Sequence, residues 1–549
     1  MARSGKNDFI AQGSILAVAS ILVRIIGMVY RIPMTAVIGD RGNSLYSYAY
    51  SIYTILLLLS SYSLPLAVSK MVSAKVELGQ WRNVRKIFAC AILFGLMTGT
   101  IFAVLILVGA RGFTTVLYND SLAAIPLRFM APTILIMSLL GVFRGFFQGL
   151  QTTRPTAVSQ LLEQLINAVI SILFSWLLFS FGAKQDAAQG TTGLAAAWGA
   201  AGGTIGTGAG AFVALLFMVV LYFGYRKKFL RTVASDSSGV NDDIREIFHI
   251  LVITAVPVIL STACYNAIDL VDGSLYSHYM AWAGAADEVR QVRWGAYTGK
   301  AILMVHIPVS IASAMAVAMV PSLSAEHARR NKKAELGKIN TILRFTSTVA
   351  FPCCVGLMIL ADPIIHTLFP SDRTQAAQYL MLAALAVVTF SFSTITNSIL
   401  QGIDRMNLPV LHSAIGLGLH VALAAILMWG FHADIWGIII GYIIFALVVT
   451  VLNFRSLYQI LHYVPDFRRV FVLPLFCSAL MGVVTFASYA LLHLFLQTAL
   501  PMLVSVLLSL AAYFALACRT GLLTAGNMKA LPGGTRLTAL ARRTGLLRE

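Results

Sequence analysis

Residues 13–38 read GSILAVASILVRIIGMVYRIPMTAVI, an apolar stretch that contains two arginines, Arg24 and Arg31. At a rise of about 1.5 Å per residue, this stretch is longer than the roughly 30 Å of hydrocarbon in a bilayer. The seven-residue spacing places both arginines on one face of a helix, roughly 10 Å apart. Because a guanidinium at membrane depth costs at least about 2.5–3.5 kcal/mol, we expect the pair to face an anionic substrate in a polar cavity.

Apolar stretches of this kind recur along the whole chain. The 549 residues are 58% hydrophobic and 11% charged, with a mean hydropathy of +0.82, which excludes an ordinary soluble surface. We predict an all-α integral membrane protein with about 14 transmembrane helices. The expected spans are residues 13–38, 46–69, 87–110, 122–147, 156–181, 193–224, 247–271, 295–323, 338–361, 375–400, 408–430, 434–456, 469–495 and 499–518.

The net charge of +18 comes from cations that gather in alternate loops. In a soluble protein such a charge would suggest nucleic acid, but the positive-inside rule explains it here and no nucleic-acid partner is expected. We predict a multi-pass protein of the plasma membrane with both termini cytoplasmic. Residues 1–10 are polar, and the first apolar stretch is too long for a signal peptide, so we expect it to remain as a span. The cations on the predicted cytoplasmic side include Lys70, Lys75, Arg82, Arg85, Lys86, Arg226, Lys227, Lys228, Arg329, Arg330, Lys332, Lys333, Arg468 and Arg469.

Two short patterns recur in the same order and predict an internal repeat. Pro65 near the end of the second span matches Pro321 in the eighth, an offset of 256 residues. The Gln148-Gly149 pair matches Gln401-Gly402 at an offset of 253. A shift of six spans keeps the orientation, which predicts two parallel six-helix lobes around a central site, followed by two C-terminal helices. The expected parts are a first lobe with its linker (1–240), a second lobe (241–462), helices 13 and 14 (463–519) and a basic cytoplasmic tail (520–549).

Few polar side chains lie within the spans. Glu163 shares a helical face with Gln160 in the fifth span, where it could pair with an arginine or bind a coupling cation. A second set lies near the predicted outer ends of the seventh and eighth spans, and an outer gate, a loop anchor and an ordinary interface remain open for it. This second set is Asn266, Asp269 and Asp272, with Lys300 at the start of the eighth span.

Enzyme motifs are missing from the sequence. It contains no HExxH, P-loop or GxSxG pattern, and its six cysteines show no metal spacing. The first predicted outer loop, residues 39–43, offers a single Asp rather than the paired acids of a metal-dependent glycosyltransferase. We therefore expect a transporter with no catalytic residue, no metal and no cofactor.

Several segments of spans 1–5 resemble a known family. They are Arg24, Arg31-Ile32-Pro33, residues 143–149 (FRGFFQG), Pro155-Thr156-Ala157 and residues 159–164 (SQLLEQ). The chain is similar to the stage V sporulation protein B and polysaccharide-biosynthesis transporters, which are related to lipid II flippases within the multidrug/oligosaccharidyl-lipid/polysaccharide superfamily. The resemblance implies an exporter of lipid-linked cell-wall precursor with cations in its cavity. Arg24 and Arg31 match the family's arginines by position, Lys300 is a looser match, and span 2 lacks the arginine that lipid II flippases tend to have.

The resulting prediction is a flippase that works by alternating access. Its expected substrate is an undecaprenyl-diphosphate-linked glycan, lipid II of peptidoglycan synthesis first of all, and its other partner is the lipid bilayer. Alternatives are an exporter of another lipid-linked oligosaccharide, a cation-coupled multidrug exporter of the same superfamily and, less favoured, a membrane glycosyltransferase. A multidrug exporter would be expected to carry acidic rather than basic cavity residues. The energy source, the oligomeric state and a role in sporulation remain open.

Overall fold

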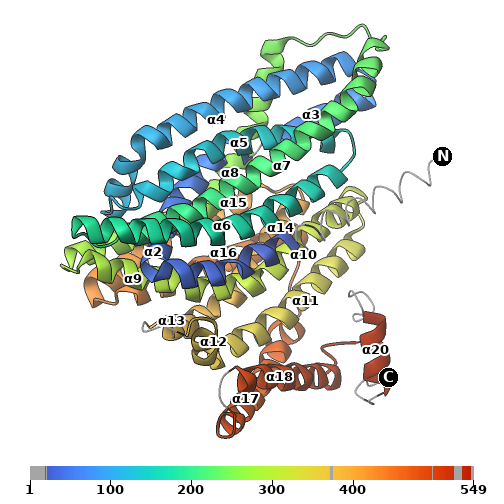
Figure 1. Ribbon diagram of the computed structural model, residues 1–549. Helices are drawn as coiled ribbons and strands as arrows, with labels where there is room; N and C mark the ends of the chain where they lie inside the picture. The colour runs from blue at the N-terminus through green and yellow to red at the C-terminus, as the bar shows by residue number, and fades with distance from the viewer. Residues whose placement is uncertain are drawn as a thin grey trace. The chain divides into compact units, whose positions relative to one another are not determined.

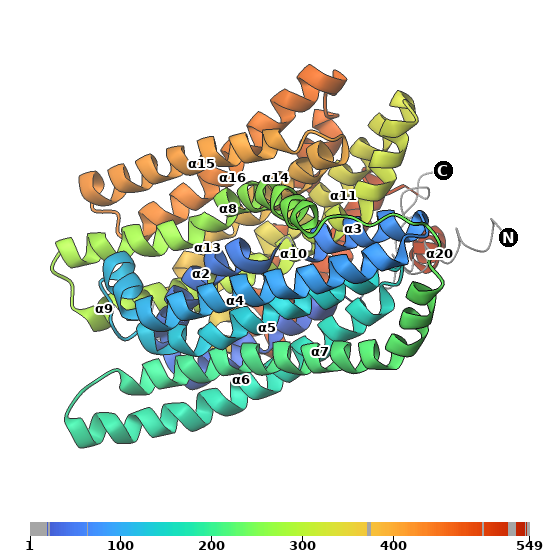
Figure 2. The ribbon, with the colours of Figure 1, turned by 90° about the horizontal axis from the view of Figure 1, so that it is seen from above.

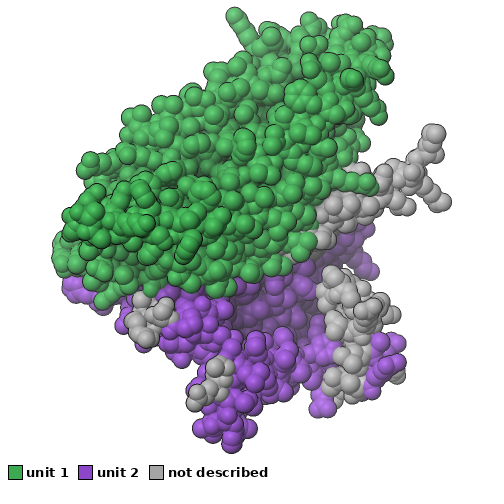
Figure 3. Space-filling view, in the orientation of Figure 1, with its two compact units in different colours: residues 1–299 green, residues 300–549 purple. Residues whose placement is uncertain are grey.

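The computed structural model describes residues 19, 22–62, 64–370, 375–496, 499–524, 534–543 and 545, and these residues contain helices and no strand (Figure 1). This confirms the predicted all-α class. Contacts divide the chain into two compact units, residues 1–299 and 300–549 (Figure 3). These units are defined by contacts, whereas the expected lobes 1–240 and 241–462 are defined by an internal repeat, and the lobes stay a prediction. Residues 1–10, the first span before residue 22 apart from residue 19, and residues 525–533, 544 and 546–549 of the tail lie outside the described residues.

The first unit consists of long helices that follow one another with short connections. They are α2 (Arg31–Leu57), the π-helix η1 (Leu58–Tyr62), α3 (Leu64–Glu77), α4 (Trp81–Tyr118), α5 (Ala124–Gly149), α6 (Arg154–Gln189), α7 (Leu194–Ala234), α8 (Ile244–Trp282) and α9 (Asp287–Ala296). Residues 22–29 before α2 are also helical. The π-helix η2 (Tyr297–Ala301) leads from this unit into the next.

The second unit begins with helices that enclose a core around Leu323, Leu343 and Phe392. Its elements are α10 (Ile302–Ala328), α11 (Lys332–Ile359), α12 (Ala361–Leu368), α13 (Ala376–Ala383), α14 (Leu385–Gly402), α15 (Asn407–Ala425), η3 (Ile426–Gly430), α16 (Ile435–Leu461), η4 (Arg468–Val472), α17 (Leu473–His493), α18 (Leu500–Arg519) and α20 (Gly534–Arg543). α17 packs against α18 through buried small and polar residues, with Thr485 Oγ1 2.6 Å from Ser509 Oγ.

A single glycine makes the corner between the first two expected spans. Gly39 has φ 67° and ψ −179°, a left-handed φ that glycine adopts without a steric penalty. The Asn43 side chain donates from Nδ2 to the Gly39 carbonyl at 3.1 Å and helps to hold the break. The expectation of a loop at residues 39–43 is therefore wrong, because the helix resumes directly after the glycine.

The described residues contain eleven helices that are long and apolar enough to cross a membrane, or twelve if the bent pair α13 and α14 forms one span. The expected number of fourteen is not confirmed. Part of the difference arises because residues Leu22–Glu77 count as one stretch of 56 residues. At 1.5 Å per residue this stretch is about 84 Å long, which is enough for two crossings joined at Gly39.

Helices α6 and α7 lie side by side along their length (Figure 2). Gly202, Gly206 and Gly210 of α7 face α6 so closely that an added methyl group would overlap Phe174, Ser171 and Glu163 respectively. Small residues at a spacing of four allow this approach of two membrane helices. The contact fixes the helix that presents Glu163 and Gln160 to the interior of the first unit.

Candidate functional site

Arg31 lies beneath two tyrosines of its own helix. Its guanidinium carbon is 5.5 Å from the ring centroid of Tyr46 and 5.5 Å from that of Tyr50, and the two rings stack at 5.6 Å. In a straight helix Arg31 and Tyr46 would be about 22 Å apart, so the break at Gly39 brings them together. Arg31 is half-buried, whereas Tyr46 is 4% exposed.

Two polar groups of this cluster leave room for a ligand: the Tyr46 hydroxyl and the Arg31 guanidinium. The Tyr46 hydroxyl is buried without a hydrogen-bond partner. No described carboxylate lies within ion-pair distance of Arg31, whose contacts are the two aromatic rings, a side-chain hydrogen bond with Tyr30 and its electrostatic neighbours. A buried donor without an acceptor costs about 1–3 kcal/mol. A cation with no carboxylate at ion-pair distance and a buried hydroxyl beside it together suit an anionic ligand.

Helix α8 brings its acidic pair into the same region. Asp269 interacts electrostatically with both Arg31 and Asp272, and Tyr297 interacts with both acids. Asp269 is exposed, Asp272 is 3% exposed and Asn266 is half-buried one turn earlier. Asp269 therefore links Arg31 to Asp272, although the sequence analysis assigned the arginine and the two acids to separate sets.

Helix α6 supplies a third contribution. Glu163 Oε2 forms an ion pair with Arg144 of α5 at 2.7 Å, and Arg144 Nε donates to Ser159 Oγ at 2.9 Å. The two side chains are 20% and 11% exposed. Gln160 Oε1, one turn from Glu163, is buried with no partner among the described residues. Arg144 lies in the segment that carried the family resemblance, yet the sequence analysis gave it no role.

The first span contacts this helix between its two arginines. A methyl group on Gly27 would lie 2.7 Å from Gln164 Nε2, and Asn167 Nδ2 donates to the Tyr30 hydroxyl at 3.4 Å. Arg24, two turns before Arg31, has an exposed side chain. Lys300 belongs to the second unit, where it is 4% exposed and its Nζ lies 5.5 Å from the Phe369 ring.

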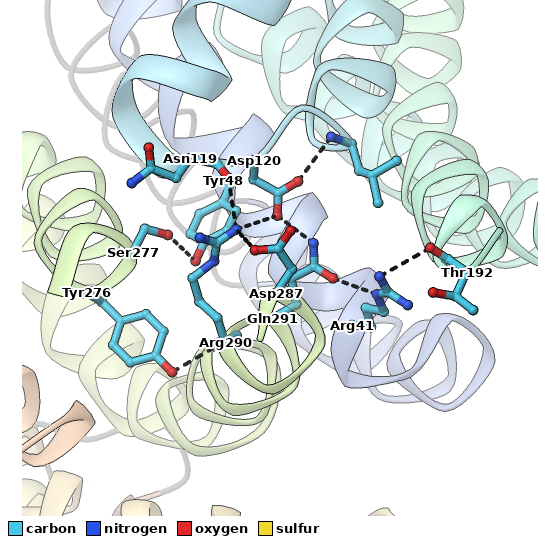
Figure 4. Close-up of polar contacts among 11 residues, drawn as sticks. Arg41, Tyr48, Asn119, Asp120, Thr192, Tyr276, Ser277, Asp287, Arg290 and Gln291 are labelled. Atoms are coloured by element: carbon cyan, nitrogen blue, oxygen red, sulfur yellow. Dashed lines mark hydrogen bonds and ion pairs between the residues drawn. The ribbon is translucent and has the colours of Figure 1, made fainter. Parts of the chain in front are cut away.

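A second polar cluster lies where α9 meets α2 just after the Gly39 corner, and we call it the α9 network (Figure 4). At its centre Arg290 is 1% exposed, donates to the Asn119 carbonyl at 2.9 Å and pairs with Asp287 at 3.1 Å and Asp120 at 3.7 Å. The α9 network consists of Arg41, Asn119, Asp120, Thr192, Asp287, Arg290 and Gln291.

Hydrogen bonds extend the α9 network across four segments. Gln291 Nε2 donates to Asp120 Oδ2 at 2.5 Å, and Arg41 Nε donates to Gln291 Oε1 at 2.5 Å. Arg41 also donates to the Thr192 carbonyl at 3.3 Å. Burial raises the pKa of the Asp120 carboxyl, and the bonds from Gln291 and the charge of Arg290 oppose that rise. The network thus joins α9 to α2 and to the loops that follow α4 and α6.

An aromatic layer lies against the α9 network. Tyr48 stacks on Tyr118 at 4.2 Å, and Tyr276 stacks on Trp294 at 5.2 Å. The Tyr48 hydroxyl is 2.9 Å from Ser277 Oγ of α8 (Figure 4). The sequence analysis gave Arg41 and Arg290 no role. The one available signal was the Asp287–Arg290 spacing of three on a short polar helix.

A third polar cluster, the linker clamp, holds the segment between α7 and α8 against the turn from α3 to α4. Arg82 N donates to Asp236 Oδ2 at 2.8 Å, and Lys75 pairs with Asp242 at 2.5 Å. Asn83, which is fully buried, donates to the Val240 carbonyl and accepts from Asp242 N. The backbone N–H of Arg82 and the donors of Ser238 lower the pKa of Asp236 to about 2.

Comparison with known proteins agrees with these features. A family profile described as polysaccharide biosynthesis protein matches residues 9–327, and one described as MatE matches residues 296–426. The chain is 26% identical over 546 residues to the lipid II flippase MurJ of Bacillus subtilis (strain 168), covering 94% of this chain and 96% of that protein. It is 22% identical over 495 residues to stage V sporulation protein B of the same organism, with 88% and 91% covered.

Solved structures extend the likeness to the fold. The structure titled "Lipid II flippase MurJ, inward closed conformation" matches with a TM-score of 0.62 at 15% identity, over 91% of this chain and 97% of that one. The resemblance predicted from spans 1–5 is confirmed, and so is a transporter rather than an enzyme. Because the first profile covers more than half of its length, this multi-span membrane chain belongs to the polysaccharide biosynthesis protein family.

Proposed function

We propose that this protein is a flippase for lipid-linked cell-wall precursors of the plasma membrane, with lipid II as its substrate. The observation that carries the proposal is Arg31, a guanidinium inside an apolar span with no described carboxylate at ion-pair distance. The Tyr46 hydroxyl beside it lacks an acceptor. The family and the length of the match to a lipid II flippase support the same substrate class.

The chemistry of a diphosphate fits this arrangement. A guanidinium offers two parallel N–H donors to phosphate oxygens, and such charge-assisted bonds are roughly twice as strong as neutral ones. Tyr46 would add a hydroxyl donor, and the Tyr50 ring is an apolar face for a sugar. Arg24, two turns away, would meet a second charge, and Lys300 remains a further candidate cation.

Asp269 would act on the same cation when the substrate is absent. Its electrostatic interaction with Arg31 stabilises the guanidinium in the empty site, and the anionic diphosphate would compete for it. Glu163, Gln160, Asn266 and Asp272 would position these groups. The exposed Asp269 is also the feature that favours the second candidate, a cation-coupled exporter of the same superfamily.

The membrane arrangement is part of the proposal. From the cation asymmetry we infer that both termini and the linker clamp face the cytoplasm and that the α9 network faces the outer side. With lobes at 1–240 and 241–462, the α9 network would join the first lobe to α9 of the second and close the outer side. Alternating access requires that this closure opens in each cycle.

Proteoliposomes loaded with lipid II test the substrate and the site. Arg31→Gln should reduce flipping at least about tenfold, since removing one charge-assisted contact costs about 1.5–3 kcal/mol. Arg31→Lys should rescue it only in part. Arg111→Gln, an exposed arginine of α4, is the matched control and should flip normally. Normal flipping by a stably folded Arg31→Gln would contradict the proposal, and cation-dependent export of an organic cation would favour the second candidate.

Spin labels test the opening of the outer side. Ser121 and Glu288 are both exposed and lie next to opposite partners of the α9 network. Labels on Ser121→Cys and Glu288→Cys should report a second, longer distance when substrate is added. Labels on Leu78→Cys and Arg226→Cys, both within the first lobe, are the control for a rigid body. A single unchanged distance between 121 and 288 would rule out an opening at this place.

A further inference from the structure

A cavity of the second unit lies at one end of the α17–α18 hairpin. Its volume is about 380 Å³, within the roughly 300–1,000 Å³ range of small-molecule sites. It is formed where the loop after α16 turns into η4 and where α18 ends. Its lining residues are Asp466, Arg468, Arg469, Leu473, Thr520 and Gly521.

The charges around this cavity do not balance. Asp466 pairs with Arg344 at 3.0 Å and with Arg469 at 3.7 Å, and it also accepts from the Arg469 backbone N–H. One carboxylate is thus shared by two arginines. Arg468 is exposed at the cavity and has no ion pair among the described residues, and Arg344 Nε is buried without a partner. Three arginines against one carboxylate leave a net charge of about +2 beside the cavity.

The surroundings select the kind of anion. Because α17 begins and α18 ends at this cavity, it lies at the boundary between the bilayer and water. The last residue of η4 and two residues in the first turn of α17 are apolar and exposed: Val472 is 46%, Leu475 52% and Phe476 53% exposed. A ligand with a phosphate at the cavity and acyl chains beside α17 would meet both surfaces.

We propose that this cavity binds the phosphate head group of an anionic phospholipid of the bilayer, and that Arg468 and Arg469 contact the phosphate. The site is separate from the Arg31 group and does not depend on the transported substrate. A lipid held here would couple the α17–α18 hairpin to the charge of the surrounding leaflet.

Native mass spectrometry of the purified full-length protein with phosphatidylglycerol tests the proposal. Each cation near an anionic lipid is worth about a fivefold gain in affinity. Arg468→Gln with Arg469→Gln should therefore weaken binding by about 25-fold. Arg405→Gln with Arg455→Gln, two exposed arginines elsewhere in the second unit, form the matched control and should bind normally. Equal binding by both double variants would overturn the proposal.

Two further measurements keep the test decisive. Thr520→Glu retains both arginines and places a carboxylate in the cavity, so it should also weaken phosphatidylglycerol binding. It serves as the test if the double variant fails to fold. Phosphatidylcholine should bind the unaltered protein more weakly than phosphatidylglycerol. Inorganic phosphate that displaces the lipid at equal concentration would show a site for free phosphate and contradict the lipid assignment.

Discussion

Arg31 and Arg290 are both buried or half-buried arginines of the first unit, but their surroundings are opposite. Arg290 is 1% exposed, and it has two carboxylates and a carbonyl within reach. Arg31 has two aromatic rings above it, an unsatisfied hydroxyl beside it and no described carboxylate at ion-pair distance. An arginine whose carboxylate partners are already in place stabilises the fold, whereas one without a carboxylate at ion-pair distance is available to a ligand.

The largest effect is expected at Arg290. Arg290→Met leaves Asp120 buried without its cation, and removing one partner of a buried pair costs about 3–5 kcal/mol. The thermal unfolding midpoint of the purified protein should fall sharply. Arg111→Met, which changes an exposed arginine of α4, is the control and should change it little. If Arg290→Met unfolds at the same temperature as the unaltered protein, the ion pair between Arg290 and Asp120 does not stabilise the fold.

Glu163→Gln is expected to have an intermediate effect. It keeps the shape but removes the charge that pairs with Arg144, while the bond from Arg144 to Ser159 remains. Hydrogen bonds to charged groups contribute about 1.5–3 kcal/mol, and partial exposure should place this loss near the lower end. Chemical denaturation measures it. Combining Glu163→Gln with Arg144→Met should then cost less than the sum of the two single changes.

Two tyrosines of α2 give a smaller and sharper contrast. Tyr48→Phe removes a hydroxyl bonded to Ser277 and should cost about 0.5–1.5 kcal/mol of stability with little direct effect on substrate affinity. Tyr46→Phe removes a buried hydroxyl that lacks a partner, so stability should stay equal or rise while lipid II affinity falls. Thermal unfolding and lipid II binding, measured on both variants, separate the two roles. The reverse pattern would remove Tyr46 from the ligand site.

The smallest effect is expected at the linker clamp. Because the pKa of Asp236 is lowered to about 2, its docking contribution is present above the ordinary pKa of about 3.9 and is lost only as the pH falls toward 2. Protease cleavage of residues 234–243 should therefore be unchanged between pH 8 and pH 5. Asp236→Asn should be cleaved faster at both pH values, and Asp243→Asn, an exposed residue outside the clamp, should not.

Local features of the sequence predicted the all-α class and most spans, and they select the arginine pair as a site that stays a prediction. Hydropathy and the cost of a guanidinium in hydrocarbon act within one helix, so they can be read from consecutive residues. The partner of Glu163 is 19 residues away on another helix, and a partner of Arg290 is 170 residues away. Such pairs depend on tertiary packing, which the spacing of residues along one helix does not encode.

The corner at Gly39 escaped prediction for a different reason. Residues 39–43 have the composition of a loop, and only the backbone angles of one glycine convert them into a helix break. That same corner makes Arg31 and its two tyrosines neighbours. The candidate site therefore depended on a feature that sequence patterns describe poorly.

The one-residue corner also bears on how the chain enters the membrane during synthesis. A lone first span would expose the Arg31 guanidinium to lipid until other helices arrived. Because the second span follows after a single glycine, the two can insert as a hairpin in which Tyr46 and Tyr50 already cover the charge. The ribosome-bound chain would thus bring Arg31 into the bilayer together with the two rings that cover it, before the later helices are synthesised.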